Sequence, residues 1–114
     1  MKFVYSLILI SSFLDANDMR ALIFNGNCTT CHFINETKSA PSIVDVKKHY
    51  LNAFPTRDDF INYMSEFVKK PSLDKSIMLD AIRKHQLMPH IAFDDETIVD
   101  ITSYIYDNDF NQSK

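Results

Sequence analysis

The sequence predicts a single all-α domain in a chain of 114 residues that begins with an export signal. Two observations indicate this fold class. Apolar side chains recur three and four residues apart in several stretches, which is the spacing of an amphipathic helix. Gly26 is the only glycine, so few tight hairpins are expected, and four prolines divide the chain into short segments.

The first 16 residues have the layout of a secretory signal peptide. Lys2 supplies a positive start, residues 3–14 are apolar apart from serine and tyrosine hydroxyl groups, and Ala16 precedes a polar segment. The apolar run is too short to span a bilayer comfortably, and the alternatives are a buried N-terminal helix or an uncleaved membrane anchor. A cleaved signal would deliver residues 17–114 to the periplasm, an oxidising compartment in which a free cysteine pair tends to form a disulfide.

The first helix of the mature domain is expected over residues 17–25, where an Asn/Asp cap precedes apolar residues on one face. Gly26 should end it, because glycine readily takes the backbone conformation that terminates helices. Residues 28–32 should then form a short helical turn. Pro41 breaks the chain, since proline disfavours helix in the residue before it.

Two helices are expected in the middle of the chain. Residues 42–52 can form the first of them. Thr56 can cap the second, over residues 57–70, which has acidic side chains in its first turn. Pro71 should end this helix.

Ser72 can cap a further helix over residues 73–85. A loop over residues 86–93 then leads to a last helix over residues 94–107. The aromatic and methionine side chains on the apolar faces of all these helices are assigned to core packing.

Residues 26–35 read GNCTTCHFIN and contain the only two cysteines of the chain. Cys28 and Cys31 lie about one helical turn apart, and His32 lies four residues after Cys28, so the three side chains can point to the same side. Two thiols can then bond the two vinyl groups of one haem while the imidazole reaches its iron. The pattern C-x-x-C-H is typical of c-type haem attachment.

Three other interpretations fit this motif less well. A structural zinc site usually needs two such pairs, and a thioredoxin-like redox pair follows a strand, which is not expected here. A disulfide of such short span would cross-link almost nothing. The sequence therefore predicts one covalent haem c, with Cys28 and Cys31 as tethers and His32 as an iron ligand.

An electron carrier needs a sixth iron ligand that stays in place, and methionine sulfur or a second imidazole can provide it. The candidates in the mature chain are Met19, Met64, Met78, Met88, His49, His85 and His90. Met88 lies in a predicted loop and is followed by Pro89, which stiffens the backbone. Met64 and Met78 lie within predicted helices and are assigned to packing. We therefore expect Met88 to be the ligand, with the three histidines as alternatives.

With these residues the chain resembles the class I c-type cytochromes over most of its mature sequence. The matching pieces are a helix ending LIFNGN before CTTCH, a proline in SAPSI, LMP, and a closing helix ending ITSYIYD. The resemblance implies a cytochrome c-like bundle of short helices wrapped around one haem, with His32 and Met88 as axial ligands. It also implies that the Pro41 carbonyl accepts a hydrogen bond from the His32 ring, and that Phe24 contacts Tyr104 where the terminal helices cross.

Some positions depart from the family pattern. Ala40 and the segment RKHQL stand before the proline and the methionine, where the family often has glycine. Arg20 stands four residues before Phe24, where a glycine often lets the terminal helices approach closely. Residues 50–75 form a long segment, with an extra helix expected over one haem edge.

The expected function is one-electron transfer by an exported monomer, without enzyme activity or a small-molecule substrate. The expected partners are a membrane quinol-oxidising complex or a dehydrogenase as donor, and a terminal oxidase or peroxidase as acceptor. The net charge of −3 and the lack of a basic stripe argue against nucleic acid as a partner. The alternatives are a haem enzyme or gas sensor with an open or exchangeable sixth ligand, and a haem subunit of a larger membrane-associated redox complex.

Overall fold

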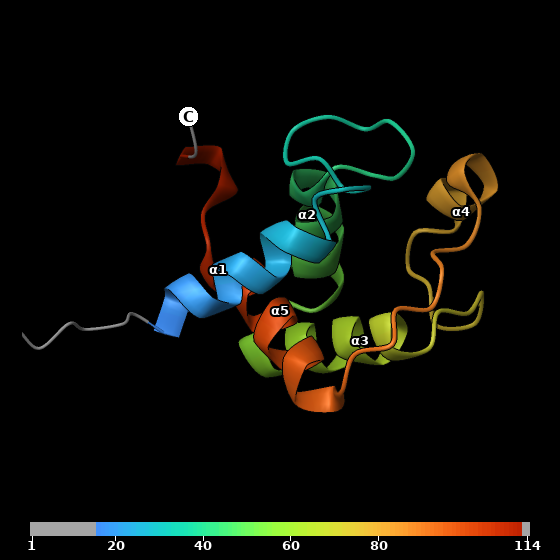
Figure 1. Ribbon diagram of the computed structural model, residues 1–114. Helices are drawn as coiled ribbons and strands as arrows, with labels where there is room; N and C mark the ends of the chain where they lie inside the picture. The colour runs from blue at the N-terminus through green and yellow to red at the C-terminus, as the bar shows by residue number, and fades with distance from the viewer. Residues whose placement is uncertain (1–15, 113–114) are drawn as a thin grey trace, which may run out of the picture.

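The computed structural model describes residues 16–112, and within them the fold is all-helical, without a strand. The elements are α1 (Ala16–Asn27), α2 (Ile43–Ala53), α3 (Arg57–Lys69), α4 (Leu79–His85), α5 (Asp95–Asp107) and the 3₁₀ turn η1 (Phe110–Gln112) (Figure 1). The all-α prediction is therefore confirmed. The expected signal peptide falls, apart from Ala16, on residues outside the described range.

α3 begins where the sequence predicts, and α2 and α5 begin one residue later than expected, at Ile43 and Asp95. A side chain caps each of these helices. The hydroxyl groups of Ser42 and Thr56 accept hydrogen bonds from backbone N–H groups three residues later, at 3.1 and 3.3 Å. The Asp94 carboxylate does the same for α5 at 2.7 Å. Hydrogen bonds from the side chain and the backbone of Thr97 lower the pKa of Asp94. Each cap satisfies a backbone donor that has no partner within the helix.

The prediction that Gly26 ends the first helix is wrong. α1 continues to Asn27, and Gly26 has a negative φ angle. Side chains satisfy carbonyl groups at the end of the helix instead, since Asn27 Nδ2 donates to the carbonyl of Ile23 at 2.8 Å and Thr29 Oγ1 donates to that of Asn25 at 2.7 Å. A left-handed glycine is therefore not needed to close this end.

The helix predicted over residues 73–85 is also shorter than expected, because α4 starts only at Leu79. The Ser72 hydroxyl does accept a hydrogen bond from Lys75 N–H at 3.3 Å, but this makes a single turn. The Ser76 hydroxyl then accepts the N–H of Met78 at 3.0 Å. Such a local side-chain bond competes with the helical pattern and keeps residues 76–78 out of the helix.

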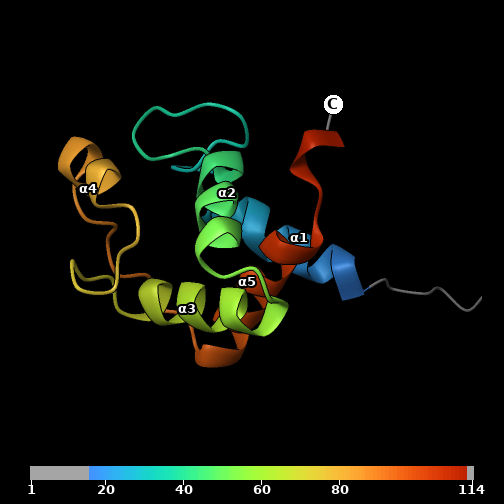
Figure 2. The same ribbon diagram turned by 180° about the vertical axis from the view of Figure 1, so that it is seen from behind.

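The core lies where α5 packs between α1 and α3 (Figures 1 and 2). α2 packs against α3 and η1. One polar pair is buried between α3 and α5, where the hydroxyl groups of Ser65 and Thr102 are 2.9 Å apart and share a hydrogen bond. The buried apolar core consists of Phe24, Ile43, Tyr50, Phe60, Ile61, Met64, Ile101, Ile105 and Phe110.

The crossing of α1 and α5 contains the predicted aromatic contact. The ring centres of Phe24 and Tyr104 are 5.2 Å apart, and Phe110 lies 5.5 Å from Phe24, so this prediction is confirmed. Arg20 follows the same crossing: its guanidinium donates to Ser103 Oγ at 2.9 Å and to Asp107 at 3.0 Å, and lies over the Tyr104 ring. The Arg20 side chain, which bonds across the crossing, thus occupies the position where the family often has glycine.

α4 lies apart from the other helices in both views (Figures 1 and 2). It makes no extensive contact with another helix within residues 16–112. The chain on either side of α4 returns to the ends of α3 and α5. Residues 71–93 therefore form an arm beside the helical core, and the space between the two belongs to the cavity described next.

Candidate functional site

An apolar cavity lies between the helical core and the arm that carries α4. Its empty volume is about 1210 Å³ when its open mouth is included. Its walls come from the turn after α1, the loop before α2, α2, α3, α5 and the arm, and they are almost entirely apolar. Such walls suit a flat apolar ligand that enters through the open mouth.

His32 lies at one wall of this cavity, in the turn that follows α1. Its N–H donates to the carbonyl of Cys28 at 2.9 Å, which closes the turn as expected. Its ring Nδ1 lies 2.7 Å from the carbonyl oxygen of Pro41, the hydrogen bond that the family resemblance implies. Because a carbonyl can only accept, Nδ1 must carry the proton, and in a neutral ring Nε2 then has a lone pair available to a metal.

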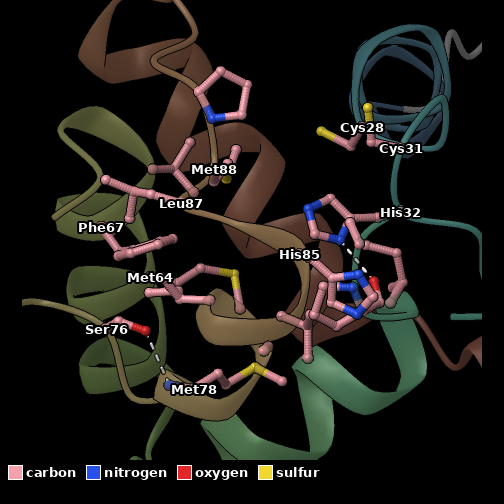
Figure 3. Close-up of a pocket in the computed structure, with 18 of the residues that line it drawn as sticks. Cys28, Cys31, His32, Met64, Phe67, Ser76, Met78, His85, Leu87 and Met88 are labelled. Carbon is pink, nitrogen blue, oxygen red and sulfur yellow. Dashed lines mark hydrogen bonds between the residues drawn. The ribbon is translucent and has the colours of Figure 1, made fainter. Parts of the chain in front are cut away.

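Cys28 and Cys31 line the same wall, and both thiols are free in the structure (Figure 3). Cys28 is half-buried against the core, whereas Cys31 is exposed. Burial raises the pKa of the Cys28 thiol to about 11, because the thiolate loses its hydration there. The structure thus brings together the four residues expected on this side of the site: the two cysteines, His32 and Pro41.

Met88 lies across the cavity from His32, beside Leu87 (Figure 3). Two further methionines line the cavity, although the sequence assigned them to packing. Met64 reaches it from α3 with 2% of its surface exposed, and Met78 reaches it from the residue before α4. The spacing of Met64 with Phe60 and Val68 marks a buried face, but no sequence signal tells a core from a cavity wall.

The three histidines that are alternatives to Met88 as distal ligand lie in different places. His85, at the end of α4, lines the cavity. His49 and His90 do not, since each lines a neighbouring hollow on the surface. Nδ1 of His49 donates to the carbonyl of Asp45 at 2.9 Å within α2. Of the histidines considered for the distal position, only His85 shares the cavity with His32 within the described chain.

Gln86 turns the chain from α4 into the loop that carries Met88. Its φ of 73° and ψ of 169° lie in a region that is essentially restricted to glycine. No other residue between 16 and 112, Gly26 included, has a positive φ. The segment RKHQL, where the family pattern often has glycine, therefore contains the strained residue of the described backbone.

Comparison of the chain with protein-family models, with curated proteins and with solved structures gives no match. Residues 16–112 hold no group of three or more His, Cys, Asp and Glu side chains that could bind a metal ion. A haem iron needs fewer ligands from the protein, because the porphyrin itself provides four nitrogen ligands. None of the described helices is long and apolar enough to cross a membrane.

Proposed function

We propose that this chain is an exported monohaem c-type cytochrome that carries single electrons between redox proteins. The observation that carries the proposal is the CTTCH turn on the wall of an apolar cavity, with the His32 ring held by the Pro41 carbonyl at 2.7 Å. A zinc site or a thioredoxin-like pair would need neither an apolar cavity nor an oriented imidazole beside its cysteines.

The described residues fit a haem in their chemistry as well as in their arrangement. Each thiol of Cys28 and Cys31 would add across one vinyl double bond, so that an S–H bond breaks while a C–S and a C–H bond form. This addition needs no external oxidant. The Pro41 carbonyl keeps the His32 ring in the tautomer whose Nε2 can bind iron, and makes this nitrogen a better donor.

Bound haem would supply an iron that changes between the ferrous and ferric states. The protein would hold both axial ligands in place and keep water away with its apolar walls. Met88 is our distal ligand, because it lies across the cavity from His32 and comes from a loop that Pro89 stiffens. A sulfur ligand raises the reduction potential relative to a second imidazole.

The donor would be a membrane quinol-oxidising complex or a dehydrogenase, and the acceptor a terminal oxidase or peroxidase. Encounters between such redox proteins usually bury little surface and are short-lived. Transfer in one-electron steps makes the chain a carrier and not an enzyme, and it would act as a monomer in the periplasm. An N-terminal segment that stays attached would instead make it a haem subunit of a membrane-associated complex.

Covalent attachment is tested on protein produced with a c-type maturation system. We expect a c-type pyridine haemochrome spectrum and the mass of one haem on the denatured protein, whereas Cys28→Ala should keep at most one thioether. Cys31→Ala should behave in the same way, and the double variant should hold no covalent haem. Haem that extracts into acidic organic solvent from the wild type would overturn the proposal.

The distal ligand is tested separately. Met88→Ala should remove the near-infrared absorption band from methionine sulfur to ferric iron and lower the reduction potential. Met64→Leu and Met78→Leu, which change the same cavity, should keep the band. Met19→Leu is the control outside the cavity, since Met19 is an exposed residue of α1. If one of these variants lost the band while Met88→Ala kept it, the methionine replaced in that variant would be the distal ligand.

His85 supports the second candidate function, a haem enzyme or gas sensor, because it lies in the cavity with His32. In that case the sixth position would be open or exchangeable. Rapid carbon monoxide binding without the sulfur band would favour this candidate. A low-spin spectrum that changes in His85→Ala and not in Met88→Ala would instead indicate two imidazole ligands.

A further inference from the structure

Three aromatic rings connect the wall of the cavity with the surface of the protein. Tyr50 of α2 lines the cavity and is 4% exposed. The ring of Phe54 lies 6.0 Å from that of Tyr50, measured between ring centres. Tyr63 of α3 stacks on Phe54 with the ring centres 4.0 Å apart and the ring planes inclined by only 6°, and 54% of its surface is exposed. The outermost of the three rings is therefore in contact with solvent.

The backbone holds these three rings in place. Phe54 directly follows α2, and its N–H donates to the carbonyl of Tyr50 at 2.7 Å, so the two rings are one helical turn apart. Thr56 then caps α3, the helix that carries Tyr63. Contacts between aromatic rings add to the stability of such an arrangement. The ring-to-ring contacts thus depend on helix geometry and not on a loop.

The two tyrosines differ in how easily they can give up an electron for good. A phenol that loses one electron also loses its proton, and the exposed Tyr63 can release that proton into water. Tyr50 retains its proton more strongly, because burial beside the cavity raises its pKa to about 12. Phenylalanine is much harder to oxidise than tyrosine, so Phe54 acts only as a bridge. An oxidation that begins at Tyr50 therefore ends on Tyr63.

The cavity contains side chains that an oxidant would damage. The thioethers of Met64 and Met78 line it, and such sulfur atoms are readily converted to sulfoxides. Bound haem supplies an iron that reacts with peroxides. On the basis of the proposed function, we infer that Tyr50, Phe54 and Tyr63 form a path by which electrons pass from the surface into the cavity when hydrogen peroxide reacts there. Tyr63 is then oxidised in place of the methionines.

A second branch of rings meets the first at Tyr50, and the two branches together balance the reaction. The ring of Phe60 lies 5.9 Å from that of Tyr50 and 5.1 Å from that of the half-buried Tyr106. One molecule of hydrogen peroxide takes up two electrons and two protons, its O–O bond breaks, and two molecules of water form. Tyr63 and Tyr106 each give up one electron and the phenol proton, and each becomes a phenoxyl radical.

The test exposes the haem-loaded protein to hydrogen peroxide together with a nitroso spin trap, which forms an adduct with tyrosyl radicals. Peptide mass mapping locates the adduct and also the oxygen added to Met64 and Met78. We expect the wild type to carry the adduct on Tyr63. Phe54→Leu keeps Tyr63 but removes the bridge, so it should lose most of this adduct and gain sulfoxide on the two methionines. Tyr63→Phe should gain the same sulfoxide.

The control is Tyr104→Phe, because the Tyr104 ring contacts Phe24 and Phe110 and does not line the cavity. It should leave the adduct and the sulfoxide as in the wild type. An equal adduct on Tyr63 in Phe54→Leu and in the wild type, with haem attached, would overturn the path alone, since peroxide would then oxidise Tyr63 from solvent. Unchanged sulfoxide in Tyr63→Phe, in which an exposed side chain loses only its hydroxyl group, would overturn it too. Wild-type protein without covalent haem would overturn the proposed function and this inference with it.

Discussion

At the scale of single residues, the two cysteines of the CTTCH turn differ in their surroundings. Burial raises the pKa of Cys28 to about 11, while Cys31 is exposed to solvent. The thiolate is the reactive form, and each unit of pKa changes its population about tenfold. In reduced, haem-free protein at pH 8, we expect iodoacetamide to modify Cys31 at least about tenfold faster than Cys28, as measured by peptide mass mapping.

Urea-unfolded protein provides the control for this experiment. Without the cavity wall both thiols are equally accessible, so their rates of modification should become similar. Equal rates in the folded protein would show that Cys28 is not shielded by the core.

At the scale of elements, Gln86 decides how α4 ends and how the loop with Met88 begins. A residue with a Cβ atom in this backbone region destabilises the fold by about 1–3 kcal/mol. Glycine would avoid this strain, but it loses more chain entropy on folding, so the net gain would be smaller. We expect Gln86→Gly to raise the free energy of unfolding by about 1 kcal/mol, measured by urea denaturation of the haem-loaded protein. Gln86→Ala keeps the Cβ atom and should bring no such gain. A gain of the same size in Gln86→Ala would contradict the strain argument.

At the scale of the whole molecule, Phe24 and Tyr104 join the two ends of the chain. Phe24 is fully buried, and truncating such a side chain costs about 3–5 kcal/mol. Contacting rings add about 0.5–1.5 kcal/mol beyond the area that they bury. We expect Phe24→Ala and Tyr104→Ala to lower the urea midpoint strongly, and the double variant to lose less than the sum.

A matched cycle combines Phe24→Ala with Tyr63→Ala. Tyr63 is exposed and stacks on Phe54, outside the cluster of Phe24, Tyr104 and Phe110. This second pair should be additive within about 0.5 kcal/mol. Strict additivity in the first cycle would mean that the terminal helices do not meet through these rings.

Asp107 connects three helices through two arginines. Its carboxylate accepts two hydrogen bonds from Arg57 at 3.0 Å and one from Arg20 at 3.0 Å, and the bonds from Arg57 are the main cause of its lowered pKa. A lowered pKa stabilises the folded state above the unfolded value of about 3.9, and this contribution is lost as the pH falls through the folded value. With 36% of the side chain exposed, solvent screening limits it to about 1 kcal/mol.

We expect Asp107→Asn to lower the free energy of unfolding by this amount at pH 7, and to differ little from the wild type at pH 3. Urea denaturation at both pH values measures the effect. Asp74→Asn, at an exposed acid outside this cluster, should be neutral at both. A loss of equal size at pH 3 and pH 7 would mean that packing, and not the charge of Asp107, causes it.

Helix ends depend mainly on contacts between neighbouring residues. The cap at Thr56 was predicted, and the starts of α2 and α5 were predicted to within one residue, because a cap involves backbone groups only three residues away. The failures at Gly26 and Ser72 are also local. In both places side chains bond to the nearby backbone and change where a helix ends or begins.

The sequence by itself determined the all-helical fold and the CTTCH turn, whereas the contact of Phe24 with Tyr104 was expected from the family resemblance. Only the tertiary structure decided which methionines and histidines share a cavity with His32. It also decided which side chains Arg20 bonds. Arg20 and Ser103 are 83 residues apart in the chain, and the walls of the cavity come from every α-helix after α1. Helical spacing tells which side chains turn away from water, but whether they meet another side chain or line a cavity depends on how distant segments pack.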